Sequence, residues 1–209
     1  MEGLIGRKIG MTQIFDEKGF AIPVTIIEAG PCSIVDKKTS EKDGYEAVQL
    51  GFIEINKKKI NSPMKGYFEK RKIKPCKILK EFRINEKNDY NIGDIVNIGI
   101  LKEAKYLNIT SISIGKGFQG TMKRHNFSGG PSSHGSTSHR KPGSIGMCVK
   151  PGETKKGQKM AGRTGGKRIT VRNLEVVKIN EENNLFFVKG AVPGHKNTIL
   201  FLKKSKKAV

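Results

Sequence analysis

Histidines and serines that could form a hydrolytic or metal site gather between positions 115 and 172, where His125, His134 and His139 lie in or near a serine-rich stretch, residues 132–138. A hydrolytic site would need an aspartate to orient a histidine beside the serine nucleophile. A metal site would need further ligands on a rigid frame, yet Glu153 is the only carboxylate in this stretch. We therefore expect neither catalysis nor a metal, and assign the histidines to base stacking or to donation toward phosphates.

A second candidate is the segment Gly115-Lys-Gly-Phe-Gln-Gly120, which matches the G-x-G-x-x-G pattern of dinucleotide-binding loops. That reading requires an acidic residue about 20 positions further on to hold a ribose hydroxyl. His139, Arg140 and Lys141 occupy those positions instead. We expect no cofactor here, and predict a helix start near which Lys116 and its neighbours meet backbone phosphates. A nucleotide-dependent enzyme built on this segment remains the first alternative.

The charge of the chain favours a nucleic-acid partner. Its 209 residues include 40 Lys and Arg against 19 Asp and Glu, a net charge of +21. Residues 115–172 contribute 13 basic side chains and one acidic, so over half the surplus lies there. Phe118 and Phe127 are the only aromatic residues in that range, which argues against single-strand stacking platforms and favours a folded RNA. A DNA-compacting protein remains the second alternative.

Residues 118–168 contain nine apolar side chains among 51, together with Gly-Gly and Pro-Gly breaks. So few core-forming residues cannot offset the conformational entropy of ordering the backbone, which costs roughly 1–2 kcal/mol per residue. We predict a long extended basic loop over 118–168, disordered or ordered by its partner. The body is predicted to be discontinuous, residues 1–117 plus 169–209.

The body predicts a mainly β fold. Short apolar or alternating runs indicate strands, separated by turn signals such as Asp43-Gly44. A helix is predicted over 62–71 with Ser62 as its N-cap, and with a following strand it forms a small α+β insertion at about 53–90. Short strands at this spacing are typical of a barrel or sandwich. A frayed, solvated tail is predicted over 203–207. The predicted strands cover 4–15, 20–27, 45–52, 79–84, 94–101, 107–114, 168–171, 174–179, 185–188 and 198–202.

The cysteine content favours a reducing compartment. Cys32, Cys76 and Cys148 form no C-x-x-C pair and are odd in number, so we expect free thiols in a cytoplasmic protein. No apolar run approaches the ~20 residues of a membrane span, and the first residues lack the pattern of a secretory signal.

Seven segments of the chain, in order and with consistent spacing, resemble the family of large-subunit ribosomal protein L-three in its bacterial or organellar form. They are Gly3-Leu-Ile-Gly-Arg-Lys-Ile-Gly-Met-Thr12, Ile22-Pro-Val-Thr25, Gly115-Lys-Gly-Phe-Gln-Gly-Thr-Met-Lys-Arg-His125, Ser133-His-Gly-Ser-Thr-Ser-His-Arg140, Pro142-Gly-Ser-Ile-Gly146, Lys159-Met-Ala-Gly-Arg-Thr-Gly166 and Val188-Lys-Gly-Ala-Val-Pro-Gly194.

The resemblance implies a translation-protein-type β-barrel with an α+β insertion and a long loop that penetrates the large-subunit rRNA. It implies a structural, non-catalytic role: binding 23S-type rRNA near its 3′ domain, early subunit assembly, and support of the peptidyl-transferase centre, with neighbouring ribosomal proteins as further partners. It implies no membrane and no small-molecule substrate. The loop tip falls at Met147, Cys148, Val149, Lys150 and Pro151, where some bacterial relatives have a methylated glutamine at the place of Val149. The rRNA-binding residues expected from charge and position are Lys116, Lys123, Arg124, His125, His134, His139, Arg140, Lys141, Lys150, Lys155, Lys156, Lys159, Arg163, Lys167, Arg168 and Arg172.

Overall fold

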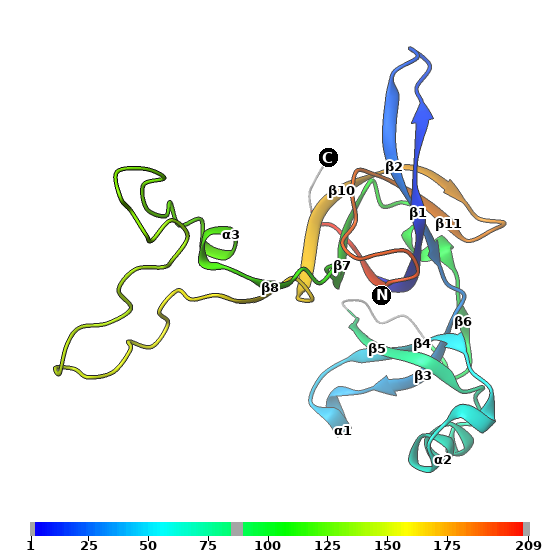
Figure 1. The fold of residues 1–209 in the computed structure, drawn as a ribbon. Coiled ribbons are helices and arrows are strands. Elements are labelled where there is room, and N and C mark those ends of the chain that lie inside the picture. The colour runs from blue at the N-terminus through cyan, green and yellow to red at the C-terminus, as the bar shows by residue number, and fades with distance from the viewer. Residues whose placement is uncertain (1–2, 85–89, 207–209) are drawn as a thin grey trace. The chain divides into compact units, whose positions relative to one another are not determined.

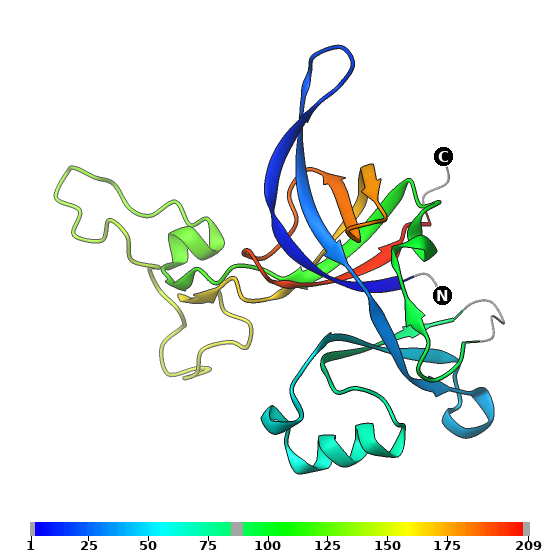
Figure 2. The same ribbon diagram turned by 90° about the vertical axis from the view of Figure 1, so that its right-hand side faces the viewer.

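The structure, a computed structural model, describes residues 3–84 and 90–206. The chain divides into two compact units. Unit 1 comprises Met1–Ile112 and Arg168–Val209, and unit 2 comprises Ser113–Lys167. The chain is mainly β, as predicted, and Figures 1 and 2 show few helices. No helix in the described ranges is long and apolar enough to cross a membrane.

Six antiparallel strands of unit 1 close into a barrel in the order β1-β12-β7-β10-β11-β2. β7 and β12 show why these segments are strands, because every second side chain in them is buried and the others face outward. Beyond the barrel, β1 and β2 continue as a two-stranded hairpin (Figure 2). The barrel strands are β1 (Gly3–Phe15), β2 (Ala21–Ala29), β7 (Tyr106–Ile112), β10 (Arg168–Asn180), β11 (Leu185–Lys189) and β12 (Ile199–Lys204).

A four-stranded sheet in the order β5-β4-β3-β6 packs beside the barrel in unit 1. Helix α2 (Ser62–Lys70) buries Phe68 against this sheet, together with Val35 and Cys76. The sheet draws on residues 32–96, a wider range than the predicted insertion of 53–90. Its strands are β3 (Cys32–Lys38), β4 (Ala47–Glu54), β5 (Cys76–Arg83) and β6 (Ile95–Val96), and the short helices of unit 1 are α1 (Ser40–Asp43), η1 (Lys57–Lys59) and η2 (Ile98–Leu101).

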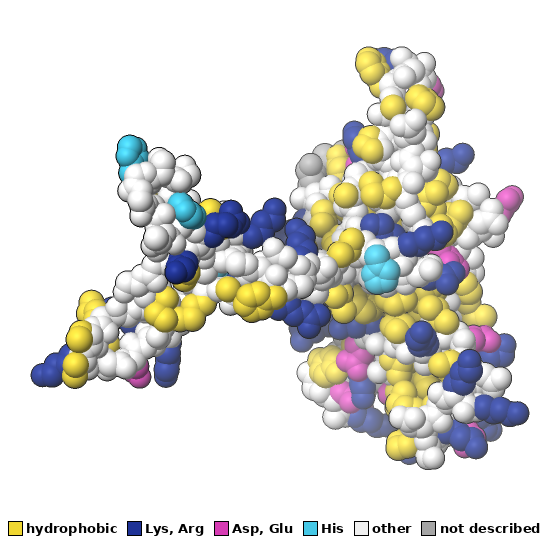
Figure 3. Space-filling model, viewed as in Figure 1, with side chains coloured by type: hydrophobic (Ala, Val, Ile, Leu, Met, Phe, Trp, Pro, Cys, Tyr) yellow, Lys and Arg dark blue, Asp and Glu magenta, His cyan; other side chains and the backbone are white. Residues whose placement is uncertain are grey.

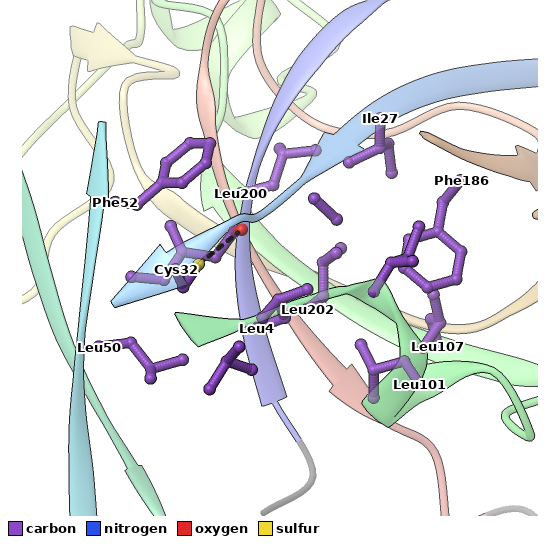
Figure 4. Packing of buried hydrophobic residues seen from close by; sticks show 14 of the residues in the cluster. Leu4, Ile27, Cys32, Leu50, Phe52, Leu101, Leu107, Phe186, Leu200 and Leu202 are labelled. Atoms are coloured by element: carbon purple, nitrogen blue, oxygen red, sulfur yellow. Dashed lines mark hydrogen bonds between the residues drawn. The ribbon is translucent and has the colours of Figure 1, made fainter. Parts of the chain in front are cut away.

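One hydrophobic core joins the barrel to the sheet. Leu4, Leu107 and Leu202 fill the barrel and Leu50 reaches the same cluster from the sheet, all of them fully buried (Figure 4). Cys32 lies in this core, where its Sγ donates a weak hydrogen bond to the Ile5 carbonyl at 3.5 Å. Burial raises the pKa of the Cys32 thiol to about 12. Burial of these apolar side chains therefore stabilises unit 1.

A buried lysine holds one edge of the barrel. Lys8 is 8% exposed, and its Nζ donates to the carbonyl oxygens of Val192 at 2.7 Å and Gly194 at 3.0 Å. It stands beside a β-bulge, where the register of β1 against β2 shifts between Lys8 and Gly10. Burial lowers the pKa of the Lys8 ammonium. The buried cation is tolerated because two carbonyl oxygens accept its hydrogen bonds.

Unit 2 contains little regular structure (Figure 1). Its elements are β8 (Gly117–Gln119), β9 (Gly162–Thr164) and helix α3 (Thr121–His125), and β8 pairs antiparallel with β9. Gly120 precedes α3 as its N-cap, so a helix does begin where the sequence predicted one.

Four local predictions for unit 1 were wrong. The strand predicted over 94–101 is a two-residue strand followed by a 3₁₀ turn, because Ile98 and Leu101 are both buried and stand three residues apart. The strands predicted over 168–171 and 174–179 are one strand with a bulge. The N-cap of α2 is Asn61 rather than Ser62. The predicted frayed tail begins too early, because Lys203 and Lys204 pair within β12.

Candidate nucleic-acid interface

The neck of unit 2 is held by backbone hydrogen bonds. The Ser113 amide donates to the Lys167 carbonyl at 2.9 Å, and the Lys116 amide donates to the Thr164 carbonyl at 2.9 Å. Gly165 has φ +70°, and a side chain there would collide with the carbonyl of Ile114. The two passing segments are thus close enough to pair only because a glycine stands at this point.

The G-x-G-x-x-G segment lies in this neck and does not have the geometry of a dinucleotide-binding loop. Residues 117–119 form β8, which runs antiparallel to β9. A dinucleotide-binding loop instead links a strand to a crossover helix and a parallel strand. Gly115–Gly120 therefore forms one side of a hairpin neck, with the Lys116 side chain exposed.

Helix α3 is tied to the returning segment by two of the predicted rRNA-binding side chains. Arg124 Nη1 donates to the Met160 carbonyl at 2.6 Å, and His125 Nε2 lies 3.0 Å from the same oxygen. The Arg124 guanidinium also lies where a side chain at Gly162 would stand. A guanidinium has five N–H donors, so Arg124 can support the loop and still present donors to an anion.

A second tie closes the loop of residues 129–139. The Gly130 amide donates to the His139 carbonyl at 3.1 Å, and His139 Nδ1 is hydrogen-bonded to the Pro131 carbonyl at 2.7 Å. Side chains at Gly129 or Gly130 would collide with the carbonyls opposite. His139 thus supports the loop, whereas His134 is exposed with φ +56°.

The predicted tip residues form the most exposed apolar stretch of unit 2. Met147 is 70% exposed and Val149 is 83% exposed, and the thiol of Cys148 is free and exposed. Locally, Ser144 Oγ donates to the Gly146 carbonyl at 2.8 Å. Exposed apolar side chains on a charged loop are suited to contact with another macromolecule.

Unit 2 has almost no core. Thr121 is its one buried residue across 113–167, all of which the structure describes. The unit contains 11 basic side chains and one acidic, Glu153. Within the described ranges, none of these cations forms an ion pair. Figure 3 shows Lys and Arg recurring along unit 2 while the acidic side chains gather on unit 1. Uncompensated repulsion of this kind is relieved by a polyanion.

The structure exposes nearly every residue predicted to bind rRNA. His125 alone is half-buried. Two of the set, Arg168 and Arg172, lie on strand β10 of unit 1 rather than in unit 2. No group of three or more His, Cys, Asp or Glu in the described part of the chain could hold a metal ion.

Sequence reasoning missed three cations of unit 1. Lys80, Arg83 and Lys203 line one groove together with Arg168 and Arg172. The first two belong to β5 and Lys203 to β12, so they are far apart in the chain. Their only signal in the sequence is their position on strands, where the alternation of apolar and polar residues turns them outward.

The chain is similar to known ribosomal proteins over nearly its whole length. A family model described as Ribosomal protein L3 matches residues 78–185. The chain is 48% identical over 206 residues to "Large ribosomal subunit protein uL3" of Carboxydothermus hydrogenoformans, covering 99% of this chain and 98% of that protein. It is 46% identical over 207 residues to the protein of that name from Heliobacterium modesticaldum, with the same coverage, and 48% identical to that of Thermotoga petrophila. These matches span essentially the whole chain, both units included, and the chain belongs to the ribosomal protein L3 family.

Proposed function

We propose that this protein is a non-catalytic, structural constituent of the large ribosomal subunit that binds large-subunit rRNA through unit 2. The single observation that carries the proposal is a segment of 55 residues with 11 cations, one carboxylate and one buried residue. Such a segment gains little from its own packing and much from neutralised phosphates. The names of the relatives support the ribosomal setting.

The finer part of the proposal concerns where unit 2 goes. RNA helices crowd together inside a folded rRNA, and a cationic segment without a bulky core suits the crevices between them. The proposal places the exposed residues 147–151 toward the peptidyl-transferase centre and the binding region near the 3′ domain of the rRNA. Any influence on peptide-bond formation would then be indirect, through the geometry of the RNA. Early binding would also assist subunit assembly.

Neighbouring ribosomal proteins are the other proposed partners. The β1–β2 hairpin exposes Met11 at 53%, Phe15 at 64% and Phe20 at 69%. Its turn, Asp16-Glu-Lys-Gly19, has two acidic side chains and one basic, a net negative charge that disfavours contact with phosphates. Exposed apolar side chains beside such a turn suit a protein surface better than RNA.

The test removes charge from unit 2 while leaving its backbone ties in place. Five exposed lysines are replaced by glutamine in the full chain, and binding to a transcript of the rRNA 3′ domain is measured by filter retention between 50 and 300 mM salt. The slope of log affinity against log salt should fall by about 3 to 5, since each phosphate contact contributes roughly 0.7–0.9. The five are Lys141, Lys150, Lys155, Lys156 and Lys159.

A matched control removes five exposed lysines from unit 1: Lys42, Lys59, Lys70, Lys105 and Lys196. The two variants have equal net charge, so general attraction to RNA falls equally in both. A control that loses as much of the salt dependence as the unit 2 variant would overturn the proposal. Duplex DNA competing as well as the rRNA transcript would favour a DNA-compacting protein instead.

A further inference from the structure

Unit 1 contains a second cationic site, a groove of about 590 Å³ that lies outside unit 2. One wall is strand β5 and the floor is the outer face of β12, β7 and β10. Its lining residues are Tyr45, Ala47, Lys80, Glu81, Phe82, Arg83, Asn108, Thr110, Arg168, Thr170, Arg172, Phe201 and Lys203.

The floor of the groove is a row of side chains on three paired strands. Phe201 pairs with Thr110, which pairs in turn with Thr170. The two threonine hydroxyls are hydrogen-bonded at 2.8 Å. Thr110 and Phe201 alternate with the buried residues of β7 and β12, and Thr170 lies beside Thr110, so the row faces away from the barrel interior. The groove is therefore rigid at its base.

A β-bulge accounts for the presence of Arg172. The register of β10 against β7 shifts between Val171 and Leu174, and Asn173 there has φ +57°. The Asn173 amide donates to Asn108 Oδ1 at 2.9 Å. Bulges re-aim side chains next to binding sites, and here the bulge leaves Arg172 among the residues that line the groove.

The groove has five cations and one carboxylate. The carboxylate, on Glu81, accepts a hydrogen bond from the Tyr45 hydroxyl at 3.1 Å. Two of the cations lie over rings: Lys80 Nζ is 5.6 Å from the centre of the Phe201 ring, and the Arg83 guanidinium carbon is 5.9 Å from that of Tyr45. Among the described residues, none of the five cations pairs with a carboxylate. Positive charge is thus concentrated along an open groove and left uncompensated.

We infer that this groove binds the sugar–phosphate backbone of an rRNA strand, as a second contact separate from unit 2. The inference rests on the proposed function and deepens it. Cations along one groove match the repeated charge of a phosphodiester chain. Phe201, which is half-buried and lines the groove, offers an apolar surface for a sugar or base beside the cations. An acidic protein segment would also meet the charges, and the experiment below separates it from RNA.

The test substitutes the three groove cations that the sequence did not single out, as Lys80→Gln, Arg83→Gln and Lys203→Gln in the full chain. Affinity for the rRNA 3′-domain transcript should fall about tenfold, and the slope of log affinity against log salt should fall by about 2 to 3. A urea midpoint equal to that of the parent checks that unit 1 remains folded. A control with Lys42→Gln, Lys59→Gln and Lys105→Gln should lose much less affinity.

The result can be separated from failure of the proposed function. If the unit 2 lysine variant weakens binding while the groove variant equals its control, the groove inference is overturned and the proposed function stands. If neither the parent nor any variant prefers the transcript to duplex DNA, the proposed function fails first. A variant with Lys80→Arg, Arg83→Lys and Lys203→Arg should retain affinity, since phosphate contacts depend chiefly on charge.

A second readout identifies the occupant directly. A photo-crosslinking phenylalanine analogue at position 201 is incorporated into the full chain, and the chain is assembled into large subunits. Crosslinks to rRNA would support the inference. Crosslinks only to protein, or none above those of an analogue at the buried position 186, would overturn it.

Discussion

Units 1 and 2 are made from one chain but use cations in opposite ways. In unit 1, cations are placed beside partners: Arg7 lies 2.6 Å from Glu28, Arg71 lies 2.7 Å from Asp36, and Lys8 is buried on two carbonyls. All 26 buried apolar side chains of the described residues also belong to unit 1. In unit 2 the cations are exposed. Its shape is held by glycines, by backbone hydrogen bonds and by hydrogen bonds from the side chains of Arg124, His125 and His139 to backbone carbonyls.

The difference shows what each unit depends on. Unit 1 balances conformational entropy with buried apolar surface and needs no partner to do so. Unit 2 has no comparable source of free energy within itself, so under the proposed function its order would depend on the rRNA phosphates that neutralise it. The groove of unit 1 combines the two, because its cations are unpaired but stand on a rigid floor.

Thiol reactivity gives the largest expected contrast between the units. Burial raises the pKa of the Cys32 thiol to about 12 and also raises that of Cys76, and only the thiolate reacts. At pH 8 about one Cys32 thiol in 10⁴ is ionised. In the isolated protein, Ellman's reagent should therefore label exposed Cys148 about 10³-fold faster than Cys32 and also faster than Cys76. Labelling of the two buried thiols should accelerate as the pH rises. A Cys148→Ser chain with an equally fast phase would contradict this.

Alanine substitutions in the core of unit 1 and at the tip of unit 2 should give the next largest contrast, in the free energy of unfolding. Phe186 is fully buried in the barrel, and Phe186→Ala should lower the free energy of unfolding by about 3–5 kcal/mol. Val149 is 83% exposed, and Val149→Ala should change that free energy by less than about 0.5 kcal/mol. Urea unfolding followed by circular dichroism measures both. Equal losses would mean that the tip packs on something within the chain.

Two lysines test whether cations serve folding in one unit and binding in the other. Lys8→Met leaves two buried carbonyls without their donor, and should cost about 1–3 kcal/mol of stability with no change in the salt dependence of rRNA binding. Lys150→Met should leave stability unchanged and lower the slope of log affinity against log salt by about 0.7–0.9. If both variants affect both quantities, the separation between the units is lost.

A glycine at the neck tests how far binding depends on the backbone geometry of unit 2. Gly165→Ala forces a left-handed residue to carry a side chain against the Ile114 carbonyl, a strain of about 1–3 kcal/mol. Because the neck belongs to unit 2, this should appear as a roughly tenfold loss of rRNA affinity, with the urea midpoint of unit 1 unchanged. Gly115→Ala is the matched control, because nothing lies within 4 Å of its added carbon. Equal affinities for the two variants would contradict a rigid neck.

Much of the fold could be predicted from local pattern. The alternation over 107–114 and 198–202 predicts two strands, and both are present as β7 and β12 because one face of each lies in the barrel. Residues 94–101 alternate as well, yet only Ile95–Val96 form a strand. Ile98–Leu101 form a 3₁₀ turn, because burial of Ile98 and Leu101 in the shared core outweighs strand propensity. Strand β3 was not predicted, because it ends in the polar residues Asp36-Lys-Lys38, which interrupt the apolar pattern of a strand.

The candidate binding residues also divide into those that local sequence predicts and those that depend on the fold. Composition alone predicts a cationic segment in unit 2, because glycine and lysine content is a local property. The groove could not be predicted, because it depends on the packing of β5 beside β12 and on a bulge in β10. Lys80 and Lys203 become neighbours only after the barrel has closed.

Closure of that barrel has a consequence for biosynthesis. Strand β1 is translated well before its partner β12, which lies at Ile199–Lys204, so the two cannot pair until nearly 200 further residues have been added. Both edges, and the apolar interior between them, stay open while the polypeptide grows. Completion of the body must therefore follow emergence of β12 from the translating ribosome. Until then the nascent chain has unpaired strand edges and exposed apolar side chains that favour aggregation, and a chaperone or bound RNA would have to cover them.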